Sequence, residues 1–160
     1  MLSNVGLICL FSVIAAAFIL VLVFLHRQHK NQAMTVDDME GHDFEYYCAQ
    51  ILRSNGFEDV QVTRGSGDFG ADILASKDGV TYAVQCKCYD WPVGVPAVQE
   101  VFAGRAFYDR MVGAVMTNQT FTRPARTLAD KLNVLLWDRD VLASMGGLDL
   151  RSFPPENTGR

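Results

Sequence analysis

Asp72, Gln85 and Lys87 place a carboxylate, an amide oxygen and an ammonium group within sixteen residues of one another. Carboxylate and amide oxygens are the hard ligands that Mg²⁺ prefers. An ammonium group beside them can orient or help deprotonate a water, or stabilise a negatively charged transition state. These residue types are those of a metal-dependent phosphodiesterase, provided that the fold brings them together.

A β-hairpin is the element that would bring them together. The stretch Gly67–Lys87 reads GDFGADILASKDGVTYAVQCK, and Asp-Gly between two alternating segments is the strongest short-range hairpin signal. With a two-residue turn, Lys77 pairs with Val80 and Asp72 faces Gln85. Side chains alternate across a strand, so Lys87 lies on the face of Gln85.

The opposite face of this hairpin is expected to be buried against a core, because it is apolar. Its residues are Ala71, Ile73, Ala75, Tyr82, Val84 and Cys86. A three-residue turn would shift the register by one and send Asp72 to that other face. An ordinary solvated hairpin face would also accommodate Asp72, Gln85 and Lys87.

Two further ligands are expected near the hairpin. The backbone carbonyl of Cys86 is the expected third metal ligand. Glu45 lies at the margin of the apolar face of an amphipathic helix predicted over residues 41–55. A Glu in a first helical turn can equally serve only to complement the helix dipole.

The remaining elements follow from periodicity, capping and turn residues. We expect a strand over 57–63, the hairpin, a helix over 96–107, a strand over 111–117, a helix capped by Thr122, a strand over 134–137 and a short helix over 138–142. This order predicts an α/β fold, a mixed sheet flanked by helices. Strand–helix–strand units after the hairpin should be parallel and right-handed.

Two motifs resemble binding sites without fitting them. The glycine-rich loop Arg64–Gly70 opens onto a strand and lacks the Gly-Lys-Ser/Thr of a phosphate-binding loop, so its glycines are expected to allow close backbone approach before Asp72. Cys86 and Cys88 have no second pair at zinc-ligand spacing and are expected to be reduced strand thiols.

The N-terminal segment Val5–Leu25 contains no charge in 21 residues, enough for about 30 Å of helix and a bilayer core. We predict a single-pass transmembrane helix rather than a cleaved signal, because a basic n-region is missing. The basic flank His26–Lys30 places the following domain in the cytoplasm by the positive-inside rule. The predicted organisation is an anchor and flank over 1–30, a linker over 31–38, a domain over 39–143 and a loose tail over 144–160.

The charge balance argues against bulk electrostatic binding of nucleic acid. The chain carries a net charge of −4, and Arg27 and Lys30 lie before the globular part, which is therefore near −6. A local basic groove remains compatible with this balance, and carboxylates that hold a cation add negative charge.

A series of short motifs resembles a known family. GxxFE at 41–45, GDxGAD at 67–72, QxK at 85–87, Val98-Gln99-Glu100, the segment 117–125 and Leu136-Trp137-Asp138 occur in the order seen in Mrr-type restriction endonucleases. These belong to the PD-(D/E)xK nuclease superfamily. The resemblance covers about residues 39–142.

The resemblance implies a restriction-endonuclease-like fold and Mg²⁺-dependent DNA cleavage, with Mn²⁺ as a substitute. It implies that Asp72 is a metal ligand, Lys87 the catalytic lysine, Glu45 an auxiliary metal or water ligand and Gln99 a residue lining the site. Gln85 stands where most of the superfamily has an acid, a departure usual in the Mrr branch. Because double-strand cleavage ordinarily requires two active sites, a homodimer is expected.

Three hypotheses follow from the sequence. The first is a membrane-anchored, cytoplasm-facing endonuclease acting on foreign or modified DNA. The second is an inactive nuclease-fold module that binds nucleic acid or a protein partner at the membrane. The third is a structural membrane protein whose hairpin face is merely solvated.

Overall fold

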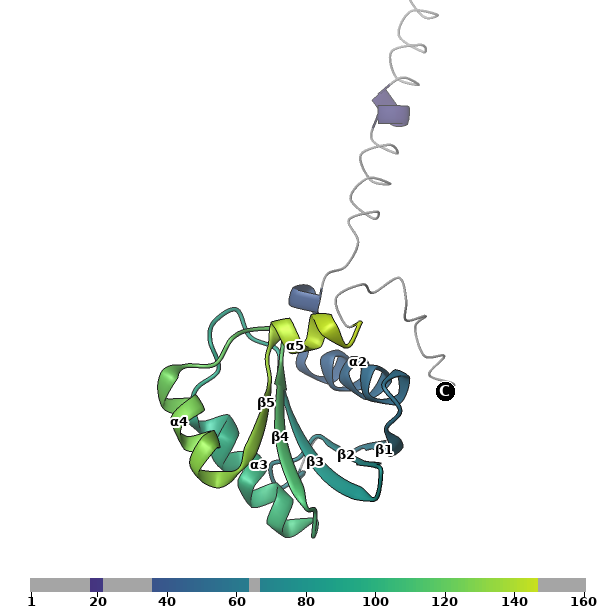
Figure 1. Cartoon of the computed structure of the whole chain (residues 1–160). Coiled ribbons are helices and arrows are strands. Elements are labelled where there is room, and N and C mark those ends of the chain that lie inside the picture. Colours follow the sequence, from purple (N-terminus) through teal and green to yellow (C-terminus); the bar gives the residue numbers. More distant parts are fainter. Residues whose placement is uncertain (1–17, 22–35, 64–66, 147–160) are drawn as a thin grey trace, which may run out of the picture. The chain divides into compact units, whose positions relative to one another are not determined.

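The computed structural model describes residues 18–21, 36–63 and 67–146 (Figure 1). The chain divides into two units, Met1–Ala33 and Met34–Arg160. Within the described part of the first unit, 18–21 are helical, and the rest of the predicted membrane span lies outside the described residues. No helix among the described residues is long and apolar enough to cross a bilayer.

The second unit is built on a five-stranded mixed sheet. Its elements are η1 (Val36–Asp38), α2 (Gly41–Ser54), β1 (Glu58–Val62), β2 (Ile73–Lys77), β3 (Val80–Lys87), α3 (Val95–Phe107), β4 (Val112–Thr117), α4 (Arg123–Leu132), β5 (Val134–Trp137) and α5 (Arg139–Ser144). The strand order is β1-β2-β3-β4-β5, antiparallel from β1 to β3 and parallel from β3 to β5. The mixed sheet, its flanking helices and the parallel pairs after the hairpin confirm the predicted fold.

The hairpin has the predicted two-residue turn. Lys77 pairs with Val80, and Ile73 pairs with Val84. Asp78 and Gly79 both have positive φ, 51° and 78°, as a turn matching the twist of two antiparallel strands requires. This register excludes the one-residue shift that would part Asp72 from Gln85.

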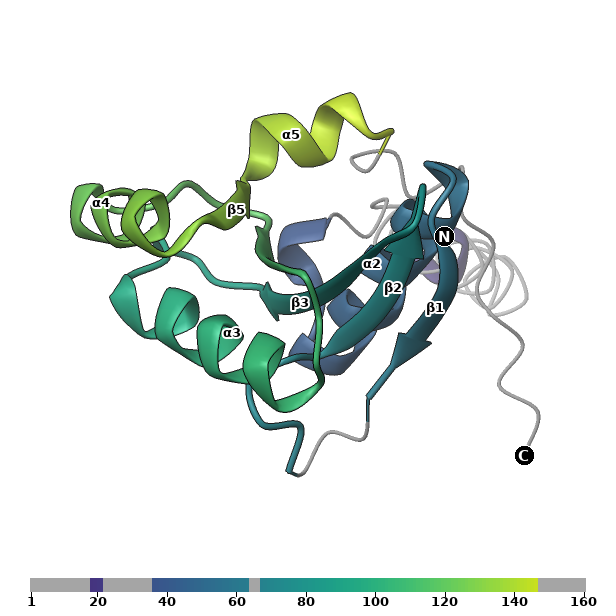
Figure 2. The ribbon, with the colours of Figure 1, turned by 60° about the horizontal axis from the view of Figure 1, so that its bottom comes forward.

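Two apolar clusters fill the two sides of the sheet, with α2 on one side and α3 and α4 on the other (Figure 2). Ile73, Val84 and Cys86 are buried, as predicted, and they pack in the cluster that contains the buried residues of α2. Ala71 was expected there too, but it packs in the cluster under α3. The reason is that β2 begins only at Ile73, so strand alternation does not extend back to Ala71.

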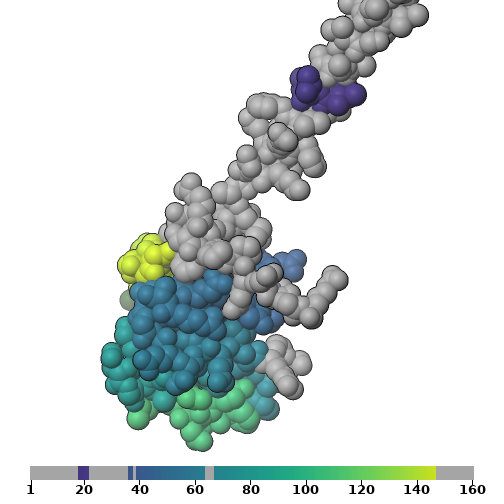
Figure 3. Space-filling view, turned by 90° about the vertical axis from the view of Figure 1, so that its right-hand side faces the viewer, coloured from purple at the N-terminus to yellow at the C-terminus, as the bar shows by residue number. Residues whose placement is uncertain are grey.

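The side of the domain shown in Figure 3 is formed largely by the blue segment that contains α2 and β1.

The chain just before α2 also belongs to the folded domain. Val36 is 2% exposed and packs with the cluster under α2. Asp37 forms an ion pair with Arg139 of α5 at 2.7 Å. Both residues lie in the segment predicted to be a linker, whose end is therefore part of the domain.

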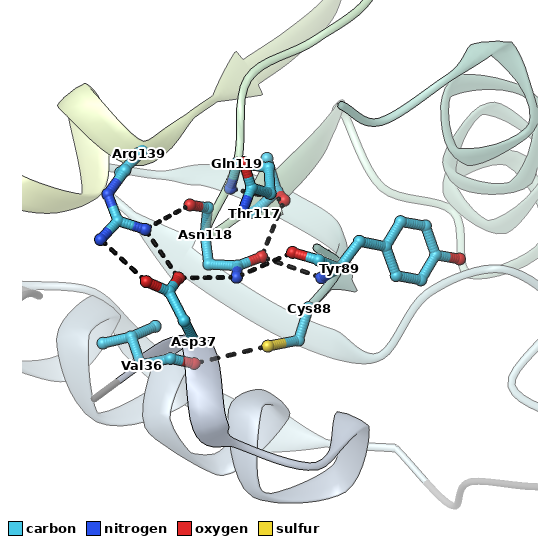
Figure 4. Close-up of polar contacts among 8 residues, drawn as sticks. All are labelled: Val36, Asp37, Cys88, Tyr89, Thr117, Asn118, Gln119 and Arg139. Carbon is cyan, nitrogen blue, oxygen red and sulfur yellow. Dashed lines mark hydrogen bonds and ion pairs between the residues drawn. The ribbon is translucent and has the colours of Figure 1, made fainter. Parts of the chain in front are cut away.

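A buried asparagine joins this segment to the end of β4. Asn118, which is 0% exposed, donates from Nδ2 to Asp37 at 2.9 Å and to the carbonyl of Tyr89 at 3.0 Å (Figure 4). Arg139 donates to the Asn118 carbonyl at 2.9 Å. This cluster fixes the chain immediately after β3, where Lys87 ends the strand.

Candidate active site

Asp72 and Gln85 meet on the hairpin as the register predicts. Asp72 Oδ2 accepts hydrogen bonds from Gln85 Nε2 at 2.5 Å and from the backbone N–H of Cys86 at 2.6 Å. The backbone N–H of Asp72 donates to the Val84 carbonyl, which continues the hairpin pairing beyond β2. Asp72 and Gln85 are only 4% and 5% exposed, so this is a buried site rather than a solvated face.

One polar atom of this pair has no protein partner. Gln85 Oε1 is buried and accepts no hydrogen bond among the described residues. A buried amide oxygen without a donor is costly unless water or a cation satisfies it. Beside a carboxylate, it provides the type of oxygen that a hard divalent cation takes as a ligand.

The donor set differs from an all-acidic or Cys/His centre. No group of three or more His, Cys, Asp or Glu side chains in the part of the chain described here is arranged to hold a metal ion. Asp72 and Gln85 instead offer one carboxylate and one amide oxygen. A Mg²⁺ ion that keeps several of its waters needs few protein ligands, so these residues fit it.

The environment of Asp72 disfavours its charge. Burial raises its pKa from 3.8 to about 7, the N–H of Cys86 opposes this rise, and the charge of Glu45 and the neighbouring Asp68 add to it. Without a cation, the Asp72 carboxyl is thus about half protonated near pH 7. A bound cation would take the place of that proton.

Lys87 lies at the end of β3 and reaches α3. Its Nζ forms an ion pair with Glu100 Oε2 at 2.8 Å. Burial lowers the pKa of Lys87, but Glu100 first and then Tyr89 and Asp72 outweigh burial and raise it. Lys87 is therefore held as a cation, and the Asp72 charge acts on it across the same face.

Glu45 and Gln99 occupy different positions relative to this centre. Glu45 is the fifth residue of α2, just beyond its first turn, and its side chain is 18% exposed. Its Oε2 lies 2.9 Å from Nδ1 of His42, and its charge is close enough to raise the pKa of Asp72. Gln99 is exposed on α3. Glu45 thus borders the site, whereas the role of Gln99 stays a prediction.

Two acidic residues at the site were not predicted from the sequence. Glu100 holds Lys87, and Asp68 interacts with Asp72. Both stand inside motifs that the sequence already shows, Glu100 directly after Gln99 and Asp68 in GDxGAD. Their positions inside these motifs were the signal in the sequence that could have identified them as site residues.

A contact between two glycines sets the position of α3. A Cβ on Gly104 would lie 2.7 Å from the backbone of Gly70 and 3.0 Å from Ala71 Cβ, and a Cβ on Gly70 would lie 2.2 Å from the Glu100 carbonyl oxygen. Only glycines allow the loop before Asp72 to approach α3 this closely. This approach brings α3 to the face on which Lys87 meets Glu100.

We therefore expect Gly104→Ala to destabilise the domain by about 1–3 kcal/mol, because both nearest atoms belong to backbone that cannot rotate away. The helix propensity gained from Ala, about 0.5–1 kcal/mol, is smaller. Urea denaturation measures the difference. Gly41→Ala is the matched control, because nothing lies within 4 Å of its added Cβ. Equal stability of the two variants would contradict the close approach.

The mixed sheet and this carboxylate–amide–lysine centre define a nuclease-like domain. The restriction endonuclease family Mrr_cat matches residues 36–146, so the chain belongs to that family. Membership identifies the chain as a nuclease that acts on DNA, in a family that generally uses divalent metals.

Two solved structures share the fold. A protein of unknown function, AF1548, is 20% identical, with a TM-score of 0.57 over 74% of this chain and 73% of that one. The DNA modification-dependent restriction endonuclease AspBHI is 22% identical, with a TM-score of 0.53 over 69% of this chain and 30% of that one. This chain therefore matches less than a third of AspBHI. Among curated proteins, none matches this chain.

Proposed function

We propose that this protein is a Mg²⁺-dependent endonuclease that hydrolyses DNA phosphodiester bonds and restricts foreign or modified DNA. The observation that carries the proposal is the buried Asp72–Gln85 pair, in which Gln85 Oε1 is left without a donor beside a carboxylate. Asp72, Gln85 Oε1 and the carbonyl of Cys86 would hold the ion, and Glu45 would hold it or a water at the rim. Mn²⁺ would serve in place of Mg²⁺. When bound, the ion supplies positive charge to the scissile phosphate and acidifies a bound water.

The side chains supply the remaining parts of the mechanism. Because Glu100 raises the pKa of Lys87, the lysine acts as a cation. It would donate hydrogen bonds to the attacking water or to a phosphate oxygen, stabilising the negative charge that develops on the phosphoryl oxygens. This favours orientation and charge stabilisation over proton abstraction by Lys87.

The cellular setting of this activity is also part of the proposal. The uncharged segment 5–25 and its basic flank support a single-pass anchor with the nuclease domain in the cytoplasm. The function named for AspBHI prompts the proposal that the DNA is modified. A homodimer would supply the two active sites needed to cut both strands.

The second candidate is a module that binds DNA or a protein at the membrane without cutting DNA. The net charge of −4 favours a protein partner over DNA for this module, because an acidic protein gains little from bulk attraction to phosphates. The two candidates differ in turnover, not in fold.

Supercoiled plasmid incubated with the full chain in detergent tests the proposal. We expect nicked and linear DNA with Mg²⁺ or Mn²⁺ and intact plasmid with EDTA. Binding of plasmid without cleavage in either metal would overturn the proposal in favour of the non-catalytic module.

A further inference from the structure

Two exposed aromatic rings follow Lys87 on the loop between β3 and α3. Tyr89 is 37% exposed and Trp91 is 61% exposed. Their ring centroids are 5.4 Å apart and their planes are inclined by only 24°, so the rings are stacked. Two stacked rings held in water leave a large apolar area uncovered.

The backbone that carries these rings is fixed on both sides. Before Trp91, the N–H of Tyr89 donates to Asn118 Oδ1 at 3.0 Å, and its carbonyl accepts from Asn118 Nδ2 at 3.0 Å. Figure 4 shows the Tyr89 ring directed away from this cluster. After Trp91, Val93 is buried and bonds to the backbone of Thr120 and Thr122. The rings are therefore presented by an ordered loop.

The chemistry of the loop selects a neutral, flat ligand. Asp90 is exposed between the two aromatic residues, and its charge would repel an anionic lipid surface. A nucleobase is uncharged and presents a π-face that stacks on Tyr or Trp whatever its identity. Tyr89 is two residues after Lys87, the last residue of β3, so such a base would lie near the phosphate that Lys87 contacts.

We propose that Tyr89 and Trp91 form a stacking platform for an unpaired base of the DNA strand held at Lys87. This proposal rests on the proposed function for the DNA and for the position of the scissile phosphate. It makes single-stranded, gapped or locally opened DNA the preferred substrate, because a base inside an intact duplex has no free face to stack.

Another exposed aromatic pair provides a matched control. Phe69 and Phe107 stack on each other at 3.8 Å and are 57% and 55% exposed, with Phe107 at the far end of α3 from this loop. Phe107→Ala removes a comparable exposed ring without changing the loop after Lys87. Its effect on DNA binding should be less than about twofold.

The test is binding of a short oligothymidylate and of a blunt duplex to the full chain in detergent and EDTA, so that no turnover is required. Single strands should quench the emission of Trp91, and Trp137→Phe should leave that quenching in place, because Trp137 packs against Phe57 and Tyr82. Trp91→Ala should weaken single-strand binding by about 5- to 100-fold and duplex binding by less than about twofold. Its melting temperature should match that of the wild type.

Three outcomes would overturn the platform. These are an unchanged single-strand affinity in Trp91→Ala, an equal loss for single strands and duplex, and quenching of Trp91 by brominated phosphatidylcholine–phosphatidylglycerol vesicles but not by DNA. If the protein cleaves plasmid but single strands do not quench Trp91, the stacking platform is wrong and the proposed function still holds. If single strands quench Trp91 and Trp91→Ala selectively weakens their binding, but plasmid is not cleaved, the platform is supported and the proposed function is wrong.

Discussion

Replacing Lys87 by methionine should lower the rate of DNA cleavage by about 10²- to 10⁴-fold. The ammonium group is held charged by Glu100 at 2.8 Å on the face that carries Asp72 and Gln85. Methionine keeps much of the packing of the long side chain and removes the only charge at that position. The loss should therefore appear in the rate of the cleavage step, measured in single-turnover reactions with excess enzyme.

Lys131→Met is the control for this substitution. Lys131 is an exposed lysine in the last turn of α4, with no ion pair among the described residues. The Lys131→Met variant should cleave DNA at the wild-type rate within about twofold. If Lys87→Met also retained that rate, Lys87 would have no part in the chemistry.

Asp72→Asn should have two effects of opposite sign, because it should abolish metal-dependent cleavage and also stabilise the metal-free domain at pH 8. Asparagine can still accept from Gln85 and from the Cys86 N–H, but it brings no negative charge for a cation. Burial raises the pKa of Asp72 from 3.8 in the unfolded chain to about 7 in the folded domain. The folded state thus binds this proton more tightly than the unfolded state does.

The sign of the pH dependence follows from that difference. The favourable contribution of protonated Asp72 is complete below pH 3.8, is lost as the pH rises toward 7, and is absent above it. At pH 8 we expect the variant to exceed the wild type in free energy of unfolding by roughly 2–4 kcal/mol. Near pH 4 the two should be close.

Urea denaturation in EDTA between pH 4 and pH 8 measures this effect. Asp130→Asn is the control, because Asp130 is exposed on α4. If the free energies of unfolding of the wild type and Asp72→Asn changed in parallel over this range, burial would not raise the pKa of Asp72.

The sequence predicted the hairpin well because its signals are local. Asp78-Gly79 determines the turn, and the turn determines which residues face each other. The burial of Asp72 and Gln85 then follows from α3 covering that face. Alternation failed at Ala71, which precedes the first residue of β2 and follows Phe69 and Gly70, both with positive φ.

Contacts between distant segments could not be predicted in this way. Asp37 belongs to a three-residue helix without periodicity, and its partner Arg139 is 102 residues away. Glu100 and Gln99 are adjacent polar residues of one helix, and the rotation of α3 decides which of them meets Lys87. That rotation depends on the packing of Gly104 against Gly70, which no local pattern encodes.

The most direct test of the proposed metal-dependent nuclease is the initial rate of plasmid cleavage as a function of Mg²⁺ concentration, with the full-length wild type and Asp72→Asn measured side by side. The wild type should show a saturable rise from no cleavage in EDTA. The variant should remain folded and cut no DNA at any metal concentration. Cleavage by Asp72→Asn at the wild-type rate, or equal cleavage with and without metal, would contradict the assignment of Asp72, Gln85 and Lys87 as the active site.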